Sequence, residues 1–476
     1  MQSRKDQVQA YFFVVGRLAA AVTHGRPDVL QPPNRRLNSG MVLGVLLACV
    51  LAGVFGIYGV FKPGGDTSWR QPGAIVMDKN SGARYVYLDG QLRPVLNYSS
   101  ARLVSGQSGG GQVISVSQSS LTGTPVGQPI GIPGAPDALP SANRLDTGPW
   151  TVCTEPAGSA PGSAGPAVTL LLGRSEGAVL QPDQALVVST SDSTNWLVWQ
   201  GKRHRLGDRT VLETLGYGDA RPVLVAPSWL NPIPQGQDIS VPVTPGAGLP
   251  GPLIDGVESV VGQVYEVRNP AIGTDQLYLV RQDGIAPLSR TSAALLLAAP
   301  FTKQSYPDSP VRPIEVGPAA MAGVPASAGA DLVGGLPQVP PRAVTPTADS
   351  YPCVLFGPSV GGELKATAEL LPAKQVRAEA VPVGAHVAGT TADEVVIPAG
   401  GGVLARDQPA PGATPGPAYL ITEVGTRFPL ADVNVMAALG YSESSVVRVP
   451  AELLQLLPTG PLLIVQCALQ VSAPRS

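Results

Sequence analysis

Hydrophobic and polar residues along the chain separate into one long apolar run and a body in which short apolar stretches alternate with turn-forming residues. Residues 41–61 (MVLGVLLACVLAGVFGIYGVF) contain no charged side chain. As an α-helix, a run of this length crosses a hydrocarbon core of about 30 Å without placing a charge in lipid. The pattern therefore predicts one transmembrane helix that separates a head, residues 1–40, from the rest of the chain.

The charges beside this run predict its orientation. Basic residues outnumber acidic ones in the head; the basic residues are Arg4, Lys5, Arg17, Arg26, Arg35 and Arg36, and the acidic ones are Asp6 and Asp28. Short segments rich in Lys and Arg stay in the cytoplasm. We therefore expect a cytoplasmic N-terminus and a translocated body.

A cleaved signal peptide is the alternative interpretation of the apolar run. Signal peptides begin near the first residue, and their shorter apolar regions end at a small-residue cleavage site. Here the run starts at residue 41 and ends in FKPGGD. These features favour a permanent anchor.

The head has a pattern of its own. Its apolar residues follow a helical spacing over residues 7–22, namely Val8, Tyr11, Phe12, Val15, Leu18, Ala19 and Val22. This spacing predicts an amphipathic helix that docks against the inner leaflet or against a cytoplasmic partner helix. A solubilising tail is the alternative, but such a tail would not keep a regular apolar stripe.

Composition describes the body further. The chain contains 56 Gly and 50 Pro, and charged residues make up only 14% of it, which is typical of short strands and many turns. The formal net charge is −2, without blocks of one sign. Nucleic-acid binding is not expected, because the chain has no basic stripe with interleaved aromatic residues.

Four segments of the body share one pattern, an apolar strand, a turn with Gly, a second strand and an amphipathic helix. They are residues 85–104, 196–216, 277–298 and 418–440, with turn glycines Gly90, Gly201, Gly284 and Gly425. Each segment predicts a β-β-α module. The second strand is expected to end at Pro94, Arg205, Pro287 or Pro429, and the helix is expected to be capped by Ser100, Thr210, Thr291 or Asp432.

The four segments form two similar pairs rather than an even array. The second and fourth continue into similar tails, residues 224–236 and 447–460, whereas the first and third continue into Pro-rich hooks, residues 126–140 and 309–321. We interpret the body as one unit duplicated around a central β core. A closed propeller or a regular solenoid fits less well, because the spacings are unequal. The first hook suits a rigid arm across a neighbouring module or subunit, or an exposed loop.

The four cysteines fall into two classes. Cys49 in the apolar run and Cys467 in the stretch LIVQCALQ are simplest as buried thiols. Cys153 and Cys353 occur in the strand-like segments PWTVC and SYPCVLF. On the translocated side they can form a disulfide, and two unpaired core cysteines are the alternative. The chain has no CxxC motif and no Cys/His cluster, so no metal site is expected.

Enzymatic motifs were sought directly. The segments 200–209 and 357–367 come nearest to a P-loop but lack its spacing. His24, His204 and His386 are scattered, and no nucleophile elbow or hydrolase triad is predicted at the abundant serines. The acidic residues Asp393, Glu394, Glu363 and Glu369 are expected on the solvated surface rather than as general acids. No catalytic or cofactor-binding residue is therefore predicted.

Several of these features together resemble one family. The basic head with RKDQVQAYFFVVGRL, the single apolar run, the hook GIPGAPDALP (131–140) and the segment PWTVC (149–153) are similar to EccB, the single-pass core component of actinobacterial type VII (ESX) secretion systems. The resemblance implies a homo-oligomeric membrane subunit that assembles with EccC, EccD and EccE and works beside a mycosin protease. It also implies four repeat domains around a central domain and a disulfide between Cys153 and Cys353. Some EccB proteins have been labelled ATPases.

The predicted architecture is α+β, with one transmembrane helix and a periplasmic body of four β-β-α modules around a β-rich core with pseudo-twofold duplication. The expected segments are 1–40, 41–61, 62–84 (linker), 85–125 (module 1), 126–194 (hook and first core half), 195–240 (module 2), 241–300 (linker and module 3), 301–417 (hook and second core half) and 418–476 (module 4 and C-terminal strand). The expected function is a structural subunit of the secretion complex in the inner membrane. A periplasmic NTPase and a cell-wall-binding or cell-wall-hydrolysing membrane protein are the alternatives.

Overall fold

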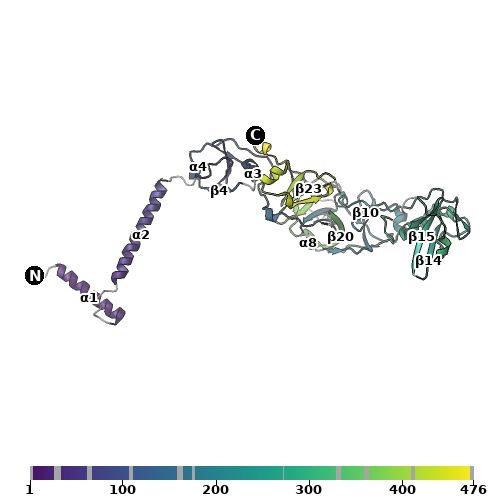
Figure 1. Cartoon of the computed structure of the whole chain (residues 1–476), viewed down its shortest axis with the longest axis horizontal. Helices are drawn as coiled ribbons and strands as arrows, with labels where there is room; N and C mark the ends of the chain where they lie inside the picture. Colours follow the sequence, from purple (N-terminus) through teal and green to yellow (C-terminus); the bar gives the residue numbers. More distant parts are fainter. Residues whose placement is uncertain are drawn as a thin grey trace. The chain divides into compact units, whose positions relative to one another are not determined.

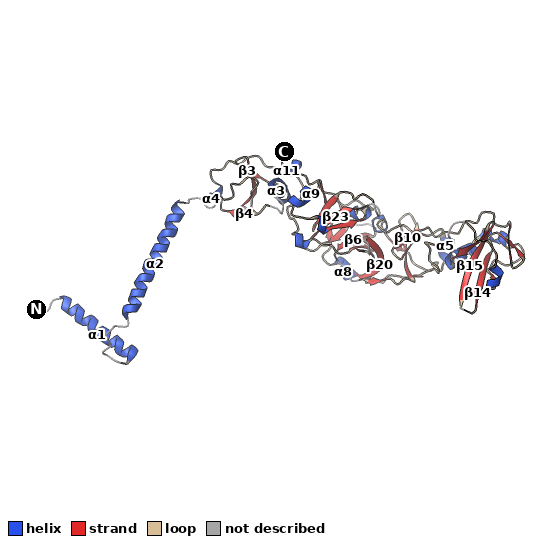
Figure 2. Cartoon of the chain, in the orientation of Figure 1, coloured by secondary structure: helices blue, strands red, loops and turns tan. Residues whose placement is uncertain are grey.

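The fold is a pair of N-terminal helices followed by a β-rich body (Figures 1 and 2). The computed structural model describes residues 4–25, 34–61, 67–106, 111–157, 165–173, 177–271, 273–328, 334–358, 364–408 and 413–471. The chain divides into two compact units, residues 1–70, 77–83 and 114–124, and residues 71–76, 84–113 and 125–476.

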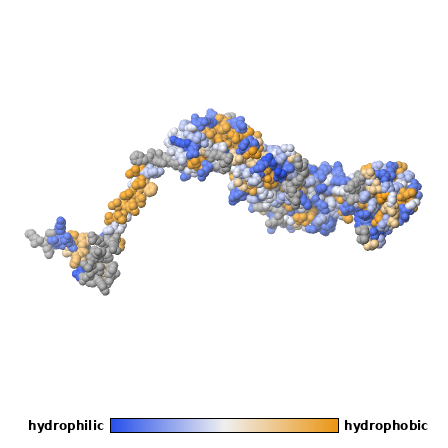
Figure 3. Space-filling model, viewed as in Figure 1, coloured by the Kyte–Doolittle hydropathy of each residue, from blue (hydrophilic) through white to orange (hydrophobic). Residues whose placement is uncertain are grey.

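Both N-terminal helices form where the apolar pattern predicts them. Helix α1 is Arg4–His24 and helix α2 is Asn34–Phe61. Within α2, the stretch Leu37–Tyr58 is long and apolar enough to cross a membrane, and α2 is the one such helix among the described residues. Figure 3 shows it as a hydrophobic rod. In α1 the exposed apolar side chains include Phe13 and Val14 as well as the predicted stripe, so its apolar surface is broader than expected.

Four sheets of the body, here called the outer sheets, share one strand order. In each, a hairpin continues into a helix, as the sequence indicates, but a further strand precedes the hairpin and another follows the helix. The orders are β3-β2-β1-β4, β10-β9-β8-β11, β16-β15-β14-β17 and β25-β24-β23-β26. In three of the sheets, the strand that follows the helix pairs in parallel with the first strand of the sheet. These pairs are β11 with β8, β17 with β14 and β26 with β23.

The first two outer sheets have the following elements. The first contains β1 (Ile75–Asp78), β2 (Arg84–Leu88), β3 (Gln91–Pro94) and β4 (Val113–Val116), with helices α3 (Tyr98–Ser105) and α4 (Gln118–Leu121). The second contains β8 (Gln184–Ser189), β9 (Asn195–Trp199), β10 (Lys202–Arg205) and β11 (Val223–Leu224), with α5 (Arg209–Thr214) and α6 (Pro227–Leu230). The short strand β18 (Arg342–Ala343) also pairs with β8.

The other two outer sheets follow the same plan. The third contains β14 (Val264–Asn269), β15 (Thr274–Arg281), β16 (Gly284–Leu288) and β17 (Ile314–Val316), with α7 (Arg290–Ala298) and the 3-10 helices η2 (Pro300–Ser305) and η3 (Pro318–Met321). A separate hairpin, β12 (Pro250–Ile254) and β13 (Val257–Val260), precedes it. The fourth contains β23 (Gly402–Asp407), β24 (Ala418–Thr422), β25 (Arg427–Leu430) and β26 (Val446–Val449), with α9 (Val433–Ala438), η4 (Glu443–Ser445), α10 (Ala451–Leu454) and α11 (Val465–Ala468).

In every outer sheet, the segment that follows the last strand runs alongside the second strand of the hairpin; we call it the return segment. The parallel bridges are Leu92 with Val126, Arg203 with Gln235, Ile285 with Ala326 and Arg427 with Thr459. The predicted contrast between tails and hooks is therefore wrong. Residues 126–140 begin such a return segment, whereas residues 309–321 contain β17 and η3. Proline cannot donate to a strand ladder, which explains why these segments read as loops.

The helix caps lie earlier than predicted in three outer sheets. The N-cap residues are Asn97, Asp208 and Ser289, and only Asp432 was predicted correctly. Ser100, Thr210 and Thr291 lie inside the first turn instead. The second strand is followed almost directly by the cap, so the helix starts sooner than hydrophobic periodicity indicates.

The hairpin glycines all have positive φ, but their turns differ. Asp89-Gly90 and Gln200-Gly201 are two-residue turns with positive φ at both positions, the type I′ geometry of tight hairpins. Gly425 lies in a longer loop between β24 and β25. Gly284 lies just after its turn, at the start of β16, and a Cβ there would approach the Pro325 carbonyl oxygen at 2.1 Å.

A seven-stranded central sheet has the order β21-β22-β6-β5-β19-β20-β7. Its strands are β5 (Trp150–Glu155), β6 (Ala167–Leu172), β7 (Ala178–Val179), β19 (Ser350–Pro358), β20 (Leu364–Pro372), β21 (Val381–Pro382) and β22 (Glu394–Val396), with η1 (Ala142–Arg144) before β5 and α8 (Ala373–Arg377) after β20. The sheet joins segments from both halves of the body. The segment between Cys353 and β24 supplies β20, β21 and β22 of this sheet.

Candidate functional site

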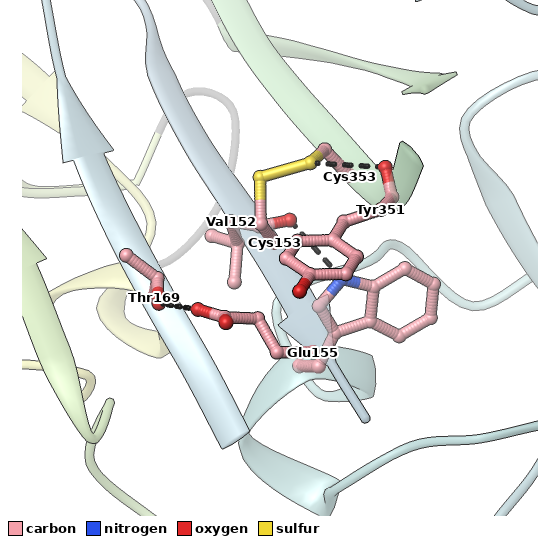
Figure 4. Close-up of a disulfide and its surroundings, with 7 residues drawn as sticks. Val152, Cys153, Glu155, Thr169, Tyr351 and Cys353 are labelled. Carbon is pink, nitrogen blue, oxygen red and sulfur yellow. Dashed lines mark hydrogen bonds between the residues drawn. A yellow bond between two sulfur atoms is a disulfide. The ribbon is translucent and has the colours of Figure 1, made fainter. Parts of the chain in front are cut away.

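The centre of the body is the antiparallel pair β5–β19, which lies in the middle of the central sheet. Its register places Cys153 opposite Cys353, and the two form a disulfide (Figure 4). Both side chains are fully buried. The bond joins residues 200 positions apart in sequence, so it links the two halves of the body directly.

One row of side chains runs across the sheet through this disulfide. Glu394 on β22 pairs with Thr169 on β6, Thr169 with Cys153, and Cys353 with Glu369 on β20. Directly paired residues share one face of a sheet. Two carboxylates therefore lie on the face that carries the disulfide, although the sequence placed Glu369 and Glu394 on the solvated surface.

Glu155 is a further buried carboxylate on this face, two residues beyond Cys153. Its side chain is 1% exposed, and its Oε2 accepts a hydrogen bond of 3.1 Å from Nε of Arg377 on α8. Its other oxygen accepts from the Thr169 hydroxyl at 2.7 Å (Figure 4). Arg377 also stacks on the Tyr351 ring, 5.3 Å from its centroid. Opposite charge and a hydroxyl donor thus compensate the cost of burying this carboxylate.

The remaining predicted acidic residues have mixed surroundings. Burial raises the pKa of Glu394, and the nearby carboxylates of Glu155 and Asp393 raise it further. Asp393 Oδ2 accepts a hydrogen bond from the Val168 amide at 2.8 Å, so it is structural rather than merely solvated. Glu363 lies outside the described residues. The prediction of a solvated acidic surface is therefore wrong for Glu369, which the central sheet buries fully, whereas Asp393 and Glu394 are partly buried.

The opposite face of the same strands carries the largest apolar core. Val152, Val354 and Phe356 lie in it, together with residues of the second and fourth outer sheets. Trp229 on α6 is fully buried there, and its Nε1 donates to the Val152 carbonyl oxygen at 3.1 Å. One side of β5 is thus fixed by the disulfide and the other by a buried indole.

Each half of the body also contributes one strand that pairs with a strand of the other half in the central sheet. β7, from the first half, pairs with β20, and β22, from the second half, pairs with β6. Both exchanges lie outside the disulfide-linked pair. The two halves are therefore joined on both sides of the bond, not only at it.

Two buried tyrosines tie the second and fourth outer sheets to connecting segments distant in the sequence. Tyr217, which follows α5, donates from Oη to the Pro341 carbonyl oxygen at 2.7 Å, and Tyr441, which follows α9, donates to that of Pro140 at 2.8 Å. Burial raises the pKa of both hydroxyls. The sequence carried a signal for them that was missed, because Leu-Gly-Tyr follows the helix in both segments, at 215–217 and 439–441.

The segments considered for catalysis have structural surroundings. Residues 200–209 form the turn after β9, strand β10 and the start of α5, and residues 357–367 belong to β19, to β20 and to positions outside the described residues. The side chain of His24 is outside the description as well, and His386 Nε2 lies 3.6 Å from Asp393 Oδ1. Among the described residues, no group of three His, Cys, Asp or Glu side chains is placed to hold a metal ion.

His204 is the one of these residues with a distinctive environment. It is fully buried on β10, and its Nδ1 lies 2.8 Å from the Gln237 carbonyl oxygen. Burial lowers its pKa and nearby Lys202 lowers it further, while the Gln237 carbonyl and Asp238 act in the opposite direction. A Cβ at Gly236 would lie 2.3 Å from the imidazole, so the return segment packs directly on the ring.

This environment predicts that acid destabilises the second outer sheet. The folded state binds a proton at His204 less readily than the unfolded state, whose pKa is about 6.5. Stability is therefore complete above that pH and falls by up to about 1.4 kcal/mol for each pH unit below it, until the folded pKa is reached. Unfolding of the full chain in urea at pH 8.0 to 5.0 measures this. His204→Asn, which keeps a donor for Gln237, is expected to flatten the profile relative to the matched variant His386→Asn; equal profiles would contradict the prediction.

Comparison with known proteins gives one consistent result. The family model for type VII secretion system ESX-1, transport TM domain B, matches residues 1–473. The chain is 32% identical over 483 residues to the Mycolicibacterium smegmatis protein named ESX-3 secretion system ATPase EccB3, covering 96% of this chain and 89% of that one. Its identity to the Mycobacterium tuberculosis protein of the same name is 30% over 493 residues, with coverage of 96% and 88%.

Solved structures agree. A chain of an intact ESX-5 inner membrane complex is similar with a TM-score of 0.71 and 25% identity, covering 100% of this chain and 96% of that chain. A chain of the EccB3 dimer from the ESX-3 core complex is similar with a TM-score of 0.69 and 30% identity, covering 83% and 100%. The mixed α+β architecture, with an apolar N-terminal helix and a β-rich body, is shared with these structures. The chain therefore belongs to the EccB family of type VII (ESX) secretion systems.

Proposed function

We propose that this chain is a structural subunit of a type VII secretion complex in the inner membrane, and that its body provides a rigid support around which the complex assembles. The observation that carries this proposal is the centre of the body. A disulfide joins β5 and β19, the fully buried Trp229 bonds to β5, and half-exposed Arg377 pairs with buried Glu155 of β5 and lies over Tyr351 of β19. Full-length similarity to chains of an ESX-5 inner membrane complex and of an EccB3 dimer supports the same role.

The proposed topology has the head in the cytoplasm and the body in the periplasm. The basic residues of the head and the apolar stretch Leu37–Tyr58 support this orientation. A disulfide between buried cysteines also suits an oxidising compartment. The partners implied by the family are EccC, EccD, EccE, a mycosin protease and further copies of this chain. The exposed aromatic residues of α1 suit contact with cytoplasmic partners or lipid.

The proposed domain organisation is a duplication. Each outer sheet with its helix is one module, modules 1 and 2 belong to the first half, and modules 3 and 4 to the second. The common strand order supports this, as do the two tyrosine contacts to Pro341 and Pro140. Cys153 and Cys353 are equivalent positions of the two halves and lie where a pseudo-twofold axis would pass.

The function is tested by assembly. The tagged full-length chain, expressed with its secretion partners, is expected to co-purify with them as a homo-oligomer after detergent extraction. A version truncated after Tyr58 is expected to lose the oligomeric assembly. A reporter fused to Ser476 is expected to be accessible from outside the cell. Complete assembly by the truncated version, or a reporter accessible only from the cytoplasm, would overturn the proposal.

ATP hydrolysis and cell-wall hydrolysis are tested on the same preparation. The curated relatives carry the word ATPase in their names. In this chain the segment nearest to a P-loop, residues 200–209, forms a hairpin turn and a strand, and its His204 is packed inside the module. We expect no nucleotide turnover and no peptidoglycan cleavage by the purified chain. Turnover that disappears on substitution of Lys202 would instead support an enzyme.

A further inference from the structure

Two contacts between modules have the same helical framework. Helix α3 of module 1 packs on α9 of module 4, with Leu103 against Val435, Met436 and Leu439 in one apolar cluster. Helix α7 of module 3 packs on α5 of module 2, with Leu295 against Val211, Leu212 and Leu215. Leu103 and Leu295 both lie six residues after their N-caps, Asn97 and Ser289. The apolar part of the two contacts is thus the same.

The polar part is different. Arg102 of α3 donates from Nη2 to the Leu439 carbonyl oxygen at 2.7 Å and from Nε to that of Ala438 at 3.3 Å. These carbonyls belong to the last turn of α9, where backbone acceptors lack helical partners and the helix dipole favours a cation. The equivalent residue of α7 is Ala294, which has no group that could bond to the end of α5.

Arg102 is held in place by its own module. Its Nη1 donates to the Tyr98 hydroxyl at 3.1 Å, and its guanidinium lies 5.7 Å from the Tyr98 ring centroid. Arg84 lies over the same ring at 5.6 Å and pairs with Asp137 at 2.6 Å, and Asp137 also accepts from the Tyr98 amide. An arginine whose side chain is already oriented loses less entropy on forming its hydrogen bonds.

A second difference reinforces the first. Helix α11 packs on α3 at the contact between modules 1 and 4, and the Gly131 amide donates to the Gln470 carbonyl oxygen beside it. At the contact between modules 2 and 3, the corresponding described residues 241–244 form no helix.

We propose that the contact between modules 2 and 3 is the hinge of the body, and that Arg102 holds modules 1 and 4 together as the fixed end. The proposal rests on the proposed duplication, because the duplication is what makes Ala294 the equivalent of Arg102. Module 3 then changes its orientation relative to the central sheet, while module 1, which follows the membrane helix, does not. Helices whose contact lacks charge-assisted hydrogen bonds separate more readily than helices that are also joined by them.

Hydrogen–deuterium exchange of the full-length chain in detergent, read by mass spectrometry, tests this. In the wild type, α5 and α7 are expected to exchange faster than α3 and α9. Arg102→Ala is expected to raise exchange in α3 and α9 about tenfold. Arg102→Lys is expected to fall in between, since ammonium lacks the planar fork. Arg93→Ala is the matched control, because Arg93 donates to the Gln128 carbonyl of its own module.

Ala294→Arg tests the converse. The new guanidinium is expected to reach the carbonyls of Thr214 and Leu215 and to slow exchange in α5 and α7 about tenfold. Strands β5 and β19 serve as the internal reference for intact folding. Equal exchange of α3 and α9 in the Arg102→Ala and Arg93→Ala variants would overturn the proposal, and so would slower exchange of α5 and α7 than of α3 and α9 in the wild type. If Arg102→Ala changes exchange but Ala294→Arg does not, Ala294 is not the equivalent of Arg102. The scaffold role is tested separately, by co-purification of the complex.

Discussion

Removing the Cys153–Cys353 disulfide is expected to lower the free energy of unfolding by roughly 5 kcal/mol, because the bond closes a loop of 200 residues in the unfolded chain. Alanine at both positions removes the bond without burying a hydroxyl or leaving a lone thiol. The expected result is a large decrease in the denaturant midpoint of the oxidised full-length chain and a lower yield of assembled complex. Dithiothreitol should affect the wild type in the same direction and leave the double variant unchanged.

Cys467→Ser is the matched control, because Cys467 is a free, half-buried cysteine outside the central sheet. It is expected to change the midpoint little. If the double alanine variant unfolded within about 1 kcal/mol of the wild type, the strands would be held by packing alone and the bond would not be what joins the halves.

Trp229→Ala is expected to cost about 3–5 kcal/mol, the usual range for emptying a fully buried aromatic site. The indole lies beneath β5 in the largest apolar core, and its loss also removes a hydrogen bond to the Val152 carbonyl oxygen. Trp229→Phe should cost less, since it keeps most of the volume and removes only the hydrogen bond. Far-UV circular dichroism is the suitable probe, because the substitution itself changes tryptophan fluorescence.

Trp199→Ala provides the comparison. Trp199 is half-buried and donates to the Pro182 carbonyl at an exposed position. Its loss is expected to be less than half of that at Trp229. Similar losses at the two positions would show that the core under β5 contributes no more than the surface of module 2.

Local patterns in the sequence were enough to predict the elements that depend on local contacts. The apolar run gives α2, and the hairpin followed by a helix occurs in all four segments. The caps at Asn97, Asp208 and Ser289 were missed because the end of a strand and the start of a helix share residues that satisfy both patterns. Of the strands that follow the helices, β11 and β17 were missed because they contain only two and three residues.

The chemistry of the centre was beyond local reasoning for a different reason. Glu369 was expected on the surface because charged side chains are seldom fully buried. Its burial follows from the pairings of β20 with β7 and of β5 with β19, which join segments far apart in the sequence, and no local pattern records such pairings. Cys153 and Cys353 were exceptions, since thiols are few and each stood in a strand-like segment.

The exchanged strands β7 and β22 set an order of events for the newborn polypeptide. Strands β5 and β6 can pair with each other early, but β19, β20 and β22, the remaining partners of β5, β7 and β6, emerge only with residues 350–396. The first half of the sheet therefore stays incomplete until most of the chain has been synthesised. During that interval the thiol of Cys153 stands without its proper mate, and a chaperone or a delay in oxidation would guard against wrong cross-links between nascent molecules.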